Sequence, residues 1–543
     1  MNIKHLLTAL FFTITSVVLA QNPSIVWQQT IGGSGNEGLQ RVENPLSNEY
    51  FLIGTSDSDI SGDKTENSRG LSDVWIVKMD VNNNILWDKT IGGDQSEWIE
   101  DVQVFNDQLF ILCRSNSSVS GEKTIAPFSG LGSSDIWLIC CDLSGTILWQ
   151  NQYGGDQPES LSKMLMLPNN NVLLGITSMS GISGNKTENA IGSDDVWTVE
   201  ISTTNGTIIN QNTIGSVNEE RFKNMLLTTT GSIMLLCQSE EGISGDKTDN
   251  GYGFSDVWMV EIDTGLNVLQ DKCFGGDGLE DSFGGNFIYE NGYFYVCVSS
   301  SSDPSGNKTA DYQGSFDLFE RNDYWVLKLD ENLNIIWDKS YGGLADDIAG
   351  GIITHPWNKF IIMGSSESNI GGNKTSPKYG GSDMWMLILN EDGDIIAQES
   401  YGGSAVDGGA VYPIPQTNAR LYYSGGSDSG VSGIKTVGTN GGYDNWSMEL
   451  DASNFLNTEE IQGAPTTISV YPNPTIDDVN FKFSQLEEDV VVDFYSIEGQ
   501  LIDSKHVPSG SSIINFELNF PRQMLVYKIN GDSIHYSGKL ILD

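Results

Sequence analysis

The pentapeptide SGDKT at residues 61–65 is one of seven closely related copies along the chain. The others are SGEKT at 120–124, SGNKT at 183–187, SGDKT at 244–248, SGNKT at 305–309, GGNKT at 371–375 and SGIKT at 432–436. Their lysines recur about every sixty residues: Lys64, Lys123, Lys186, Lys247, Lys308, Lys374 and Lys435. A period of this kind indicates a repeat architecture in which each copy belongs to one supersecondary unit.

Two further features recur with the same period. The first is an Asp-x-Trp triplet, whose aspartates are Asp73, Asp135, Asp195, Asp256, Asp323, Asp383 and Asp444. The second is a glycine pair after an apolar or aromatic residue, as in TIGG at 30–33 and 90–93, QYGG at 152–155, CFGG at 273–276 and SYGG at 340–343 and 400–403. The fourth copy of this pair is TIGS at 213–216. All three features indicate seven units.

Each unit contains four strand-length runs that are rich in β-branched and aromatic residues and bounded by turn residues. In the first unit they are GLQRVEN at 38–44, YFLIGTS at 50–56, DVWIVKMD at 73–80 and NILWDKT at 84–90. Several runs are apolar on both faces, which is typical of sheets covered on both sides. Four-stranded sheets that pack radially make a β-propeller. We therefore predict an all-β chain in which residues 21–452 form a seven-bladed β-propeller.

The ends of the repeat region predict how the ring closes. SIVWQQTIGG at 24–33 matches NILWDKTIGG at 84–93, which includes the fourth strand of a unit. The seventh unit stops after its third strand, YDNWSMELD at 443–451. The N-terminal strand is therefore expected to complete the last blade. Because neighbouring strands of a blade run antiparallel, the SGxKT loops and the glycine-pair loops should lie on the same face.

A carboxylate follows each glycine pair at a fixed distance: Glu37, Glu97, Glu159, Glu220, Glu280, Asp347 and Asp407. Together with the seven motif lysines, these groups could form a charged mouth for a ligand. Alternatively, lysine and carboxylate pair between loops, and the aspartate of Asp-x-Trp accepts backbone hydrogen bonds at the start of a strand. A ligand rarely needs one contact seven times, so the recurrence favours SGxKT as a structural clasp for a long loop.

A serine also recurs at the end of each second strand: Ser56, Ser115, Ser178, Ser239, Ser300, Ser366 and Ser427. A nucleophilic serine needs a neighbouring base and an orienting group, and the propeller region holds a single histidine, His355. Serine hydroxyls that bond backbone groups where a loop begins explain this pattern better. No catalytic residue is therefore predicted.

A calcium site is the one cofactor that the sequence leaves open. Asp57, Asp59 and Asp63 alternate with Ser61, as oxygen ligands of calcium often do, although the other units lack the full set. No Cys/His cluster has the spacing of a zinc site. Apart from calcium, no cofactor is expected.

Ligand contacts are expected where the units differ. From the motif lysine to the aspartate of Asp-x-Trp is nine residues in five units, twelve in the second and fifteen in the fifth. The two enlarged loops add four aromatic side chains and one arginine: Phe128, Tyr312, Phe316, Phe319 and Arg321. Exposed aromatics beside polar groups can stack on sugar rings or anchor a protein partner. They can equally pack onto the next loop.

Composition and the first residues constrain the environment of the protein. The 543 residues carry a formal charge of −44, which repels phosphate backbones and argues against a nucleic-acid partner. Residues 1–20, MNIKHLLTALFFTITSVVLA, have the basic start, apolar run and small residues of a signal peptide cleaved before Gln21. No later run is long and apolar enough to span a bilayer. The six cysteines stand in apolar strand-like runs, so buried free thiols are predicted.

After Leu450 the repeat ends, and a polar linker at 453–465 leads to a small predicted β-sandwich at 466–543. This module opens with YPNPT, formed by Tyr471, Pro472, Asn473, Pro474 and Thr475, and contains Gly499 in a turn and Lys539 near its end. On these residues it resembles the type A C-terminal sorting domain of the Bacteroidota type IX secretion system. One departure is PRQMLVY at 521–527, where the family usually has a glycine before the tyrosine.

The resemblance implies an export route. Such domains carry a folded cargo across the outer membrane and are removed by a sortase-like protease of the secretion machinery, after which the cargo is joined to lipopolysaccharide or released. The propeller half separately resembles bacterial β-propeller repeats of the GG-x-x-x-D/E type, found in many surface proteins. A secreted or outer-membrane surface location, reached through the periplasm, is expected.

Three functions remain open from the sequence. The first is a non-enzymatic, monomeric binding or adhesion module for a glycan or a surface protein. The second is a polysaccharide-active enzyme such as a lyase or glycosidase, because an acidic propeller mouth could hold a pair of catalytic carboxylates. The third is a structural protein of the cell envelope, which a smooth and self-paired loop face would favour.

Overall fold

The computed structural model describes residues 23–44, 49–130, 133–314, 322–355, 359–414, 420–453, 468–471, 478–483, 486, 488–496, 501–518, 523–531 and 535–542. The predicted signal peptide lies outside these residues, as does nearly all of the predicted linker. The chain divides into two compact units, Met1–Thr458 and Glu459–Asp543, and each is described by itself.

The first unit consists of seven four-stranded antiparallel sheets among its described residues. The first four are β2 (Glu37–Glu43), β3 (Tyr50–Ser56), β4 (Asp73–Met79), β5 (Ile85–Ile91); β6 (Glu97–Phe105), β7 (Gln108–Ser115), β8 (Asp135–Asp142), β9 (Ile147–Tyr153); β10 (Glu159–Met166), β11 (Asn171–Ser178), β12 (Asp195–Ser202), β13 (Ile208–Ile214); and β14 (Glu220–Leu227), β15 (Ile233–Ser239), β16 (Asp256–Ile262), β17 (Val268–Phe274). The other three are β18 (Glu280–Glu290), β19 (Tyr293–Ser300), β20 (Asp323–Asp330), β21 (Ile335–Tyr341); β22 (Asp347–His355), β23 (Lys359–Ser366), β24 (Asp383–Leu389), β25 (Ile395–Tyr401); and β26 (Asp407–Pro413), β27 (Arg420–Ser427), β28 (Asp444–Asp451) with β1 (Ser24–Ile31).

The middle strands of each sheet are buried on both faces, as their apolar runs predict. In β4, whose sequence is DVWIVKM, only Lys78 is partly exposed. The seven tryptophans of the Asp-x-Trp triplets are all fully buried. Burying a large apolar side chain contributes about 1.5–3 kcal/mol relative to leaving it exposed, so the contacts between neighbouring sheets hold this unit together.

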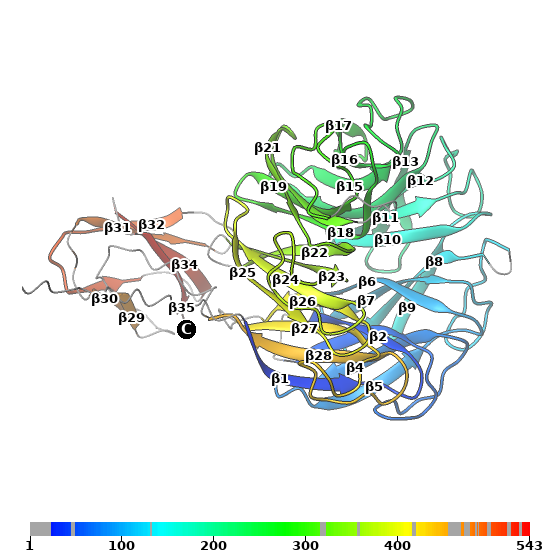
Figure 1. The fold of residues 1–543 in the computed structure, drawn as a ribbon, viewed down its shortest axis with the longest axis horizontal. Coiled ribbons are helices and arrows are strands. Elements are labelled where there is room, and N and C mark those ends of the chain that lie inside the picture. The colour runs from blue at the N-terminus through cyan, green and yellow to red at the C-terminus, as the bar shows by residue number, and fades with distance from the viewer. Residues whose placement is uncertain are drawn as a thin grey trace, which may run out of the picture. The chain divides into compact units, whose positions relative to one another are not determined.

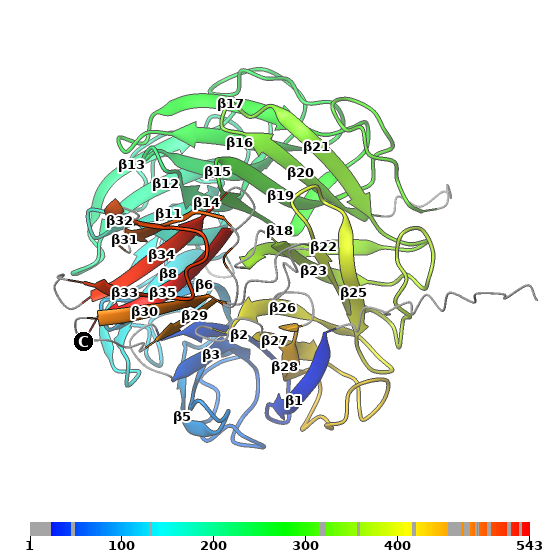
Figure 2. The same ribbon diagram turned by 90° about the vertical axis from the view of Figure 1, so that its left-hand side faces the viewer.

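The sheets lie around a common centre, with β5, β13, β17, β21 and β25 on the outside (Figures 1 and 2). The first strand of each sheet is innermost, and contacts run from β2 through β6, β10, β14, β18 and β22 to β26. This arrangement of repeated sheets is consistent with propeller blades.

The two ends of the unit meet in one sheet. β1 pairs antiparallel with β28, from Ser24 opposite Asp451 to Ile31 opposite Asn445. That sheet also contacts the first one, because β2 packs against β27 and β28. A backbone bond from Glu37 N to the Tyr443 carbonyl spans this junction at 2.6 Å, as the bond from Glu97 N to the Ser72 carbonyl spans the next at 2.7 Å.

The second unit contains two sheets among its described residues. One is β29 (Ile468–Tyr471), β30 (Asp478–Phe483) and β33 (Ile513–Glu517), and the other is β32 (Leu501–Val507), β31 (Val490–Tyr495), β34 (Gln523–Asn530) and β35 (His535–Leu542). Both contribute to one apolar core, in which the ring of Phe481 lies 5.1 Å from that of Phe516 and 4.9 Å from that of Tyr527. The predicted two-sheet module is therefore present.

Two further predictions are tested by the described residues. All six cysteines are free and buried, as their apolar surroundings predict. Burial raises the pKa of the Cys140, Cys141, Cys273 and Cys297 thiols to about 12. In the part of the chain that the structure describes, no helix has the length and apolar character needed to cross a membrane.

Candidate functional site

The SGxKT motif forms a tight turn in each unit. In the second unit, Ser120 N donates to the Lys123 carbonyl at 3.1 Å and Lys123 N donates to the Ser120 carbonyl at 2.9 Å. The glycine between them is left-handed in all seven copies, with φ between 52° and 57°. A side chain strains that conformation, which explains why every copy has glycine at this position.

The variable residue of the motif binds the glycine pair of its own unit. Glu122 N donates to the Gly92 carbonyl at 2.9 Å, and its carboxylate accepts from Gly92 N at 3.2 Å. Asn185 makes the same two bonds with Gly154. In the seventh unit Ile434 retains only the backbone bond, to the Gly402 carbonyl. The turn therefore holds the glycine-pair loop in place.

In five units the motif lysine donates to the recurring serine, whereas Lys64 donates to Thr90 and Lys308 to backbone carbonyl groups. Lys123 Nζ donates to Ser115 Oγ at 2.8 Å and to the Ser117 carbonyl at 2.9 Å, and Ser115 Oγ donates to Glu97 Oε1 at 2.7 Å. The predicted pairing of lysine with carboxylate is thus indirect, because the serine hydroxyl lies between them. The serine also accepts from Ser117 N at 3.2 Å, which is the backbone bond predicted for it.

The threonine of the motif completes the clasp. Thr124 N and Trp137 Nε1 both donate to Gln150 Oε1 at 3.1 Å, which ties the loop to the outer strand β9. In the seventh unit the same acceptor is Gln28 of β1, which receives Thr436 N at 2.9 Å and Trp446 Nε1 at 3.2 Å. The loop-face residues that recur seven times are thus engaged with one another.

The residues predicted to bind a ligand on the enlarged loops are only partly described. Phe128 is 42% exposed, and its backbone N–H donates to Asp135 Oδ2 at 2.6 Å. Tyr312 is partly buried. Phe316, Phe319 and Arg321 lie outside the described residues, so no loop site can be built from these five.

The candidate calcium ligands face different backbone groups. Asp57 accepts from Asn36 N at 2.5 Å, Asp59 from Ser68 N at 3.3 Å, and Asp63 from Gly32 N at 3.2 Å. Among the described residues no group of three His, Cys, Asp or Glu side chains has the arrangement of a metal site.

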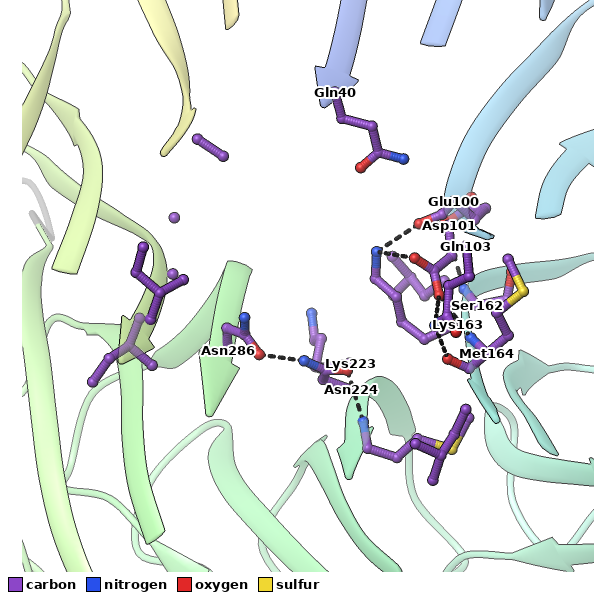
Figure 3. Close-up of a pocket in the computed structure, with 18 of the residues that line it drawn as sticks. Gln40, Glu100, Asp101, Gln103, Ser162, Lys163, Met164, Lys223, Asn224 and Asn286 are labelled. Atoms are coloured by element: carbon purple, nitrogen blue, oxygen red, sulfur yellow. Dashed lines mark hydrogen bonds and ion pairs between the residues drawn. The ribbon is translucent and has the colours of Figure 1, made fainter. Parts of the chain in front are cut away.

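A different candidate lies where the innermost strands face one another. This site, the central channel, is a cavity of about 560 Å³ lined by residues of β2, β6, β10, β14, β18, β22 and β26 (Figure 3). Four of these strands carry a β-bulge two or three residues after the recurring carboxylate, at Glu100, Leu161, Lys223 and Gly350. A bulge re-aims the side chain that it carries, so the bulged positions give the central channel its own chemistry.

One side of the channel is a polar cluster from β6 and β10 (Figure 3). Lys163 Nζ donates to the Glu100 carbonyl at 2.6 Å and lies 3.9 Å from Asp101 Oδ1. Asp101 Oδ2 accepts from Met164 N at 2.9 Å, and Gln103 Nε2 donates to the Met164 carbonyl at 2.6 Å. These bonds join two neighbouring sheets and hold carboxylate, ammonium and amide groups at the channel wall.

The rest of the channel wall is less charged. Gln40 points toward the open space from β2, and Asn224 of β14 bonds Asn286 of β18 (Figure 3). On β22 and β26 the lining is mostly glycine and aliphatic, including Ile352 and Val411. The channel therefore has one polar side and one apolar side.

Glu100 is the carboxyl group in the channel whose protonation is most affected by its surroundings. Burial raises its pKa, while Arg114 at 3.7 Å and the nearby Lys163 act in the opposite direction. A carboxyl group held this way can keep a proton at higher pH than an exposed one.

The sequence contained a signal for the channel residues. Many of them occupy the third and fourth positions after the recurring carboxylate: Gln40, Glu100 and Asp101, Ser162 and Lys163, Lys223 and Asn224, Gly350 and Gly351, Ala410 and Val411. These positions differ from unit to unit, whereas the carboxylate before them is constant. The differences in loop length predicted a site on the loop face, whereas this variation on the first strands marks the channel.

Comparison with known proteins identifies the C-terminal part of the chain. Residues 469–543 match the family model of the secretion system C-terminal sorting domain. No curated protein sequence matches the chain.

Solved structures resemble the chain only distantly. Polysaccharide lyase Uly1 has a TM-score of 0.44 at 8% identity, covering 81% of this chain and 94% of that chain. Kuenenia stuttgartiensis hydrazine synthase has a TM-score of 0.40 at 10% identity, covering 73% of this chain and 94% of that chain. Synechocystis apocarotenoid oxygenase has a TM-score of 0.37 at 11% identity, covering 74% of this chain and 88% of that chain. These values carry no information about activity.

The sorting residues are described in part. Tyr471 ends β29 and Lys539 lies in β35, while Pro472, Asn473, Pro474, Thr475 and Gly499 lie outside the described residues. The family match and the strands of the second unit cover the same part of the chain. Residues 469–543 are therefore a type IX secretion sorting domain, which directs this protein to the cell surface or the extracellular space.

Proposed function

We propose that the protein is a closed seven-bladed β-propeller that binds a glycan in its central channel after secretion by the type IX system. The proposal includes the predicted monomeric, non-enzymatic binding role. The observation that carries the proposal is that the recurring and the variable polar residues lie in different places. The polar residues that recur in every unit are engaged in the loop clasp, whereas those that vary between units line the central channel.

The chemistry of the channel supports a carbohydrate ligand. Carboxylate and amide groups such as Asp101, Gln40 and Gln103 can bond sugar hydroxyls, and aliphatic residues such as Ile353, which is partly exposed, can cover the apolar face of a sugar ring. The volume of about 560 Å³ falls within the range of small-ligand sites and is too small for a folded protein. A protein partner would have to use the loop face, where Phe128 is exposed.

The test is a glycan-array screen of residues 21–543, with calcium and again with a chelator. Lys163→Met and Gln40→Leu change the channel, and Phe128→Ala changes the enlarged loop of the second unit. Lys339→Met is the matched control, because it removes the same charge from outer strand β21, where Lys339 is 33% exposed.

We expect glycan binding that is lost in both channel variants and retained in Lys339→Met. Loss in Phe128→Ala alone would move the site to the loop face. A blank array under both conditions would contradict glycan binding and favour a protein partner or a structural role in the envelope.

Catalysis is the second candidate, and Glu100 is the observation that favours it. A partly buried carboxyl group with a raised pKa beside Asp101 is suited to act as a general acid on a polysaccharide. Incubation with acidic and neutral polysaccharides, followed by detection of new reducing ends or unsaturated sugars, tests this role. Product release by the wild type that disappears in Glu100→Gln would establish that the protein is an enzyme. If no substrate yielded products, binding would be the remaining function.

A further inference from the structure

Two buried carboxyl groups meet at each junction between neighbouring sheets of the first unit. One is the aspartate of Asp-x-Trp, and the other is the carboxylate that follows the glycine pair of the next sheet. The pairs are Asp73–Glu97, Asp135–Glu159, Asp195–Glu220, Asp256–Glu280, Asp323–Asp347, Asp383–Asp407 and Asp444–Glu37. All fourteen residues are at most 1% exposed.

The first residue of the glycine pair lies between the two groups. A Cβ atom added to Gly154 would lie 2.8 Å from Asp135 Oδ1 and 2.5 Å from Glu159 Oε2. Four other junctions have the same arrangement, around Gly32, Gly215, Gly275 and Gly342. The carboxyl oxygens of each such pair therefore face each other across one glycine.

In most of these pairs a carboxyl oxygen lacks a hydrogen-bond partner. Asp256 Oδ2 accepts from Tyr252 N at 2.7 Å, whereas its Oδ1 is buried and has no hydrogen bond within the described residues. The same holds for Oδ1 of Asp73, Asp135, Asp323, Asp383 and Asp444, and in two pairs also for Oδ1 of the facing residue, Asp347 or Asp407. The oxygens of Glu280 already accept from Gly276 N at 2.9 Å and from Ser300 Oγ at 2.7 Å. A buried oxygen without a donor is costly, so each orphaned oxygen indicates a missing hydrogen.

The charges of the junctions do not balance either. Each motif lysine faces the two carboxyl groups of its own sheet, as Lys308 faces Glu280 and Asp323. Seven lysines can neutralise seven of the fourteen carboxylates, which leaves seven negative charges buried between the sheets. Uncompensated buried charge is strongly unfavourable, and such groups neutralise instead.

We propose that each of the seven carboxyl pairs binds one proton, held between the orphaned oxygen and the carboxylate of the next sheet. The aspartate then donates a hydrogen bond across the junction. A cation fits the site less well than a proton, because the facing carboxylate oxygen already accepts a backbone N–H and a lysine lies nearby. The ring of sheets is thereby linked by protons as well as by apolar contacts.

The titration of these groups agrees with one proton per pair. Burial, reinforced by the neighbouring carboxylate, raises the pKa of at least one member of every pair. The values are about 7 for Asp256 and Asp323, about 8 for Glu159 and about 6 for Asp444. The Asp256–Glu280 pair is faced by these charged and titratable groups: Lys247, Lys308, Tyr252 and Cys273.

The sign of the pH dependence follows from these shifts. A carboxyl group whose folded pKa is raised keeps its proton in the folded state after the unfolded chain has lost it. The folded state then binds more protons than the unfolded state, so stability falls as pH rises from about 4 toward 8. This trend is opposite to that of carboxylates that are paired with cations.

Asp256→Asn tests the proposal, because an asparagine reproduces the protonated aspartate. Its carbonyl oxygen can accept from Tyr252 N, and its NH₂ group replaces Oδ1 and donates to Glu280 at any pH. Asp107→Asn is the matched control, since Asp107 is exposed and the change removes the same charge. The protein of residues 21–543 is melted at pH 5 and pH 8.5, and the infrared carbonyl stretch of protonated carboxyl groups is recorded on the folded protein.

We expect the wild-type Tm to be lower at pH 8.5 than at pH 5. Asp256→Asn should raise the Tm at pH 8.5 by about 2 °C or more and change it little at pH 5, whereas Asp107→Asn should shift both values equally. The wild-type infrared band should persist at pH 6 and weaken in Asp256→Asn. Absence of that band in the wild type would overturn the proposal. So would a calcium-dependent rise of the wild-type Tm at pH 8.5 that Asp256→Asn abolishes, because a cation would then occupy the pair.

Discussion

Replacing Ile31 by alanine tests whether the N-terminal strand is part of the core. Ile31 ends β1, lies opposite Asn445 and is fully buried against Leu39 and Trp75 of the first sheet. Ile91 occupies the equivalent place at the end of β5 and is also fully buried. If β1 closes the ring as β5 completes its own sheet, the two substitutions should have equal effects.

The expected magnitude follows from the cavity that alanine leaves. Truncating a fully buried isoleucine costs about 2–5 kcal/mol. Unfolding entropy scales with chain length, so for a unit of this size that loss lowers the Tm by about 2–5 °C. Val26→Ala is the control on the same strand, because Val26 is 45% exposed and its truncation should change the stability by less than about 0.5 kcal/mol.

Differential scanning calorimetry of the three variants and the wild type gives the comparison. We expect Ile31→Ala and Ile91→Ala to agree within about 1 kcal/mol. If Ile31→Ala had as small an effect on stability as Val26→Ala, while Ile91→Ala lost the full expected stability, β1 would be a peripheral strand. The sheet that it shares with β28 would then not close the ring in solution.

Three other outcomes are expected. Deleting residues 469–543 should retain the protein in the periplasm, and normal amounts of truncated protein in the medium or at the surface would contradict the assigned export route. Gly184→Ala should destabilise the protein by about 1 kcal/mol or more, because φ is 57° there and the methyl group would lie 2.2 Å from the Gly154 carbonyl oxygen. Gly181→Ala should be nearly neutral, since its methyl group would meet open space; equal melts would refute the structural need for glycine in the turn. Lys374→Met should cost about 3–5 kcal/mol by removing the donor to Ser366 and leaving buried carboxylates uncompensated, and an unchanged urea midpoint would show that the lysine is dispensable.

The sorting domain illustrates what local sequence can establish. YPNPT and the short strands after it were enough to predict the family that residues 469–543 match. A motif that a partner recognises must be present in the order of residues itself. Export could therefore be predicted without the fold.

The strands and the roles of the recurring residues were also largely predictable. Apolar runs such as DVWIVKM become strands because their side chains need cover on both faces. The match of residues 24–33 to 84–93 predicted the pairing of β1 with β28. The bridging role of Ser115 was not predicted, because the distance from lysine to carboxylate depends on how two loops pack.

The central channel and the carboxyl pairs could be seen only in the tertiary structure. Glu100 and Lys163 come from neighbouring sheets, and each strand contains a β-bulge that the period of the sequence does not mark. Asp444 and Glu37 are far apart in the chain and become partners only when the last sheet meets the first. The period of the sequence determined the repeated element, because strand formation depends on local pattern, whereas burial, protonation and the channel depend on which elements the packing brings together.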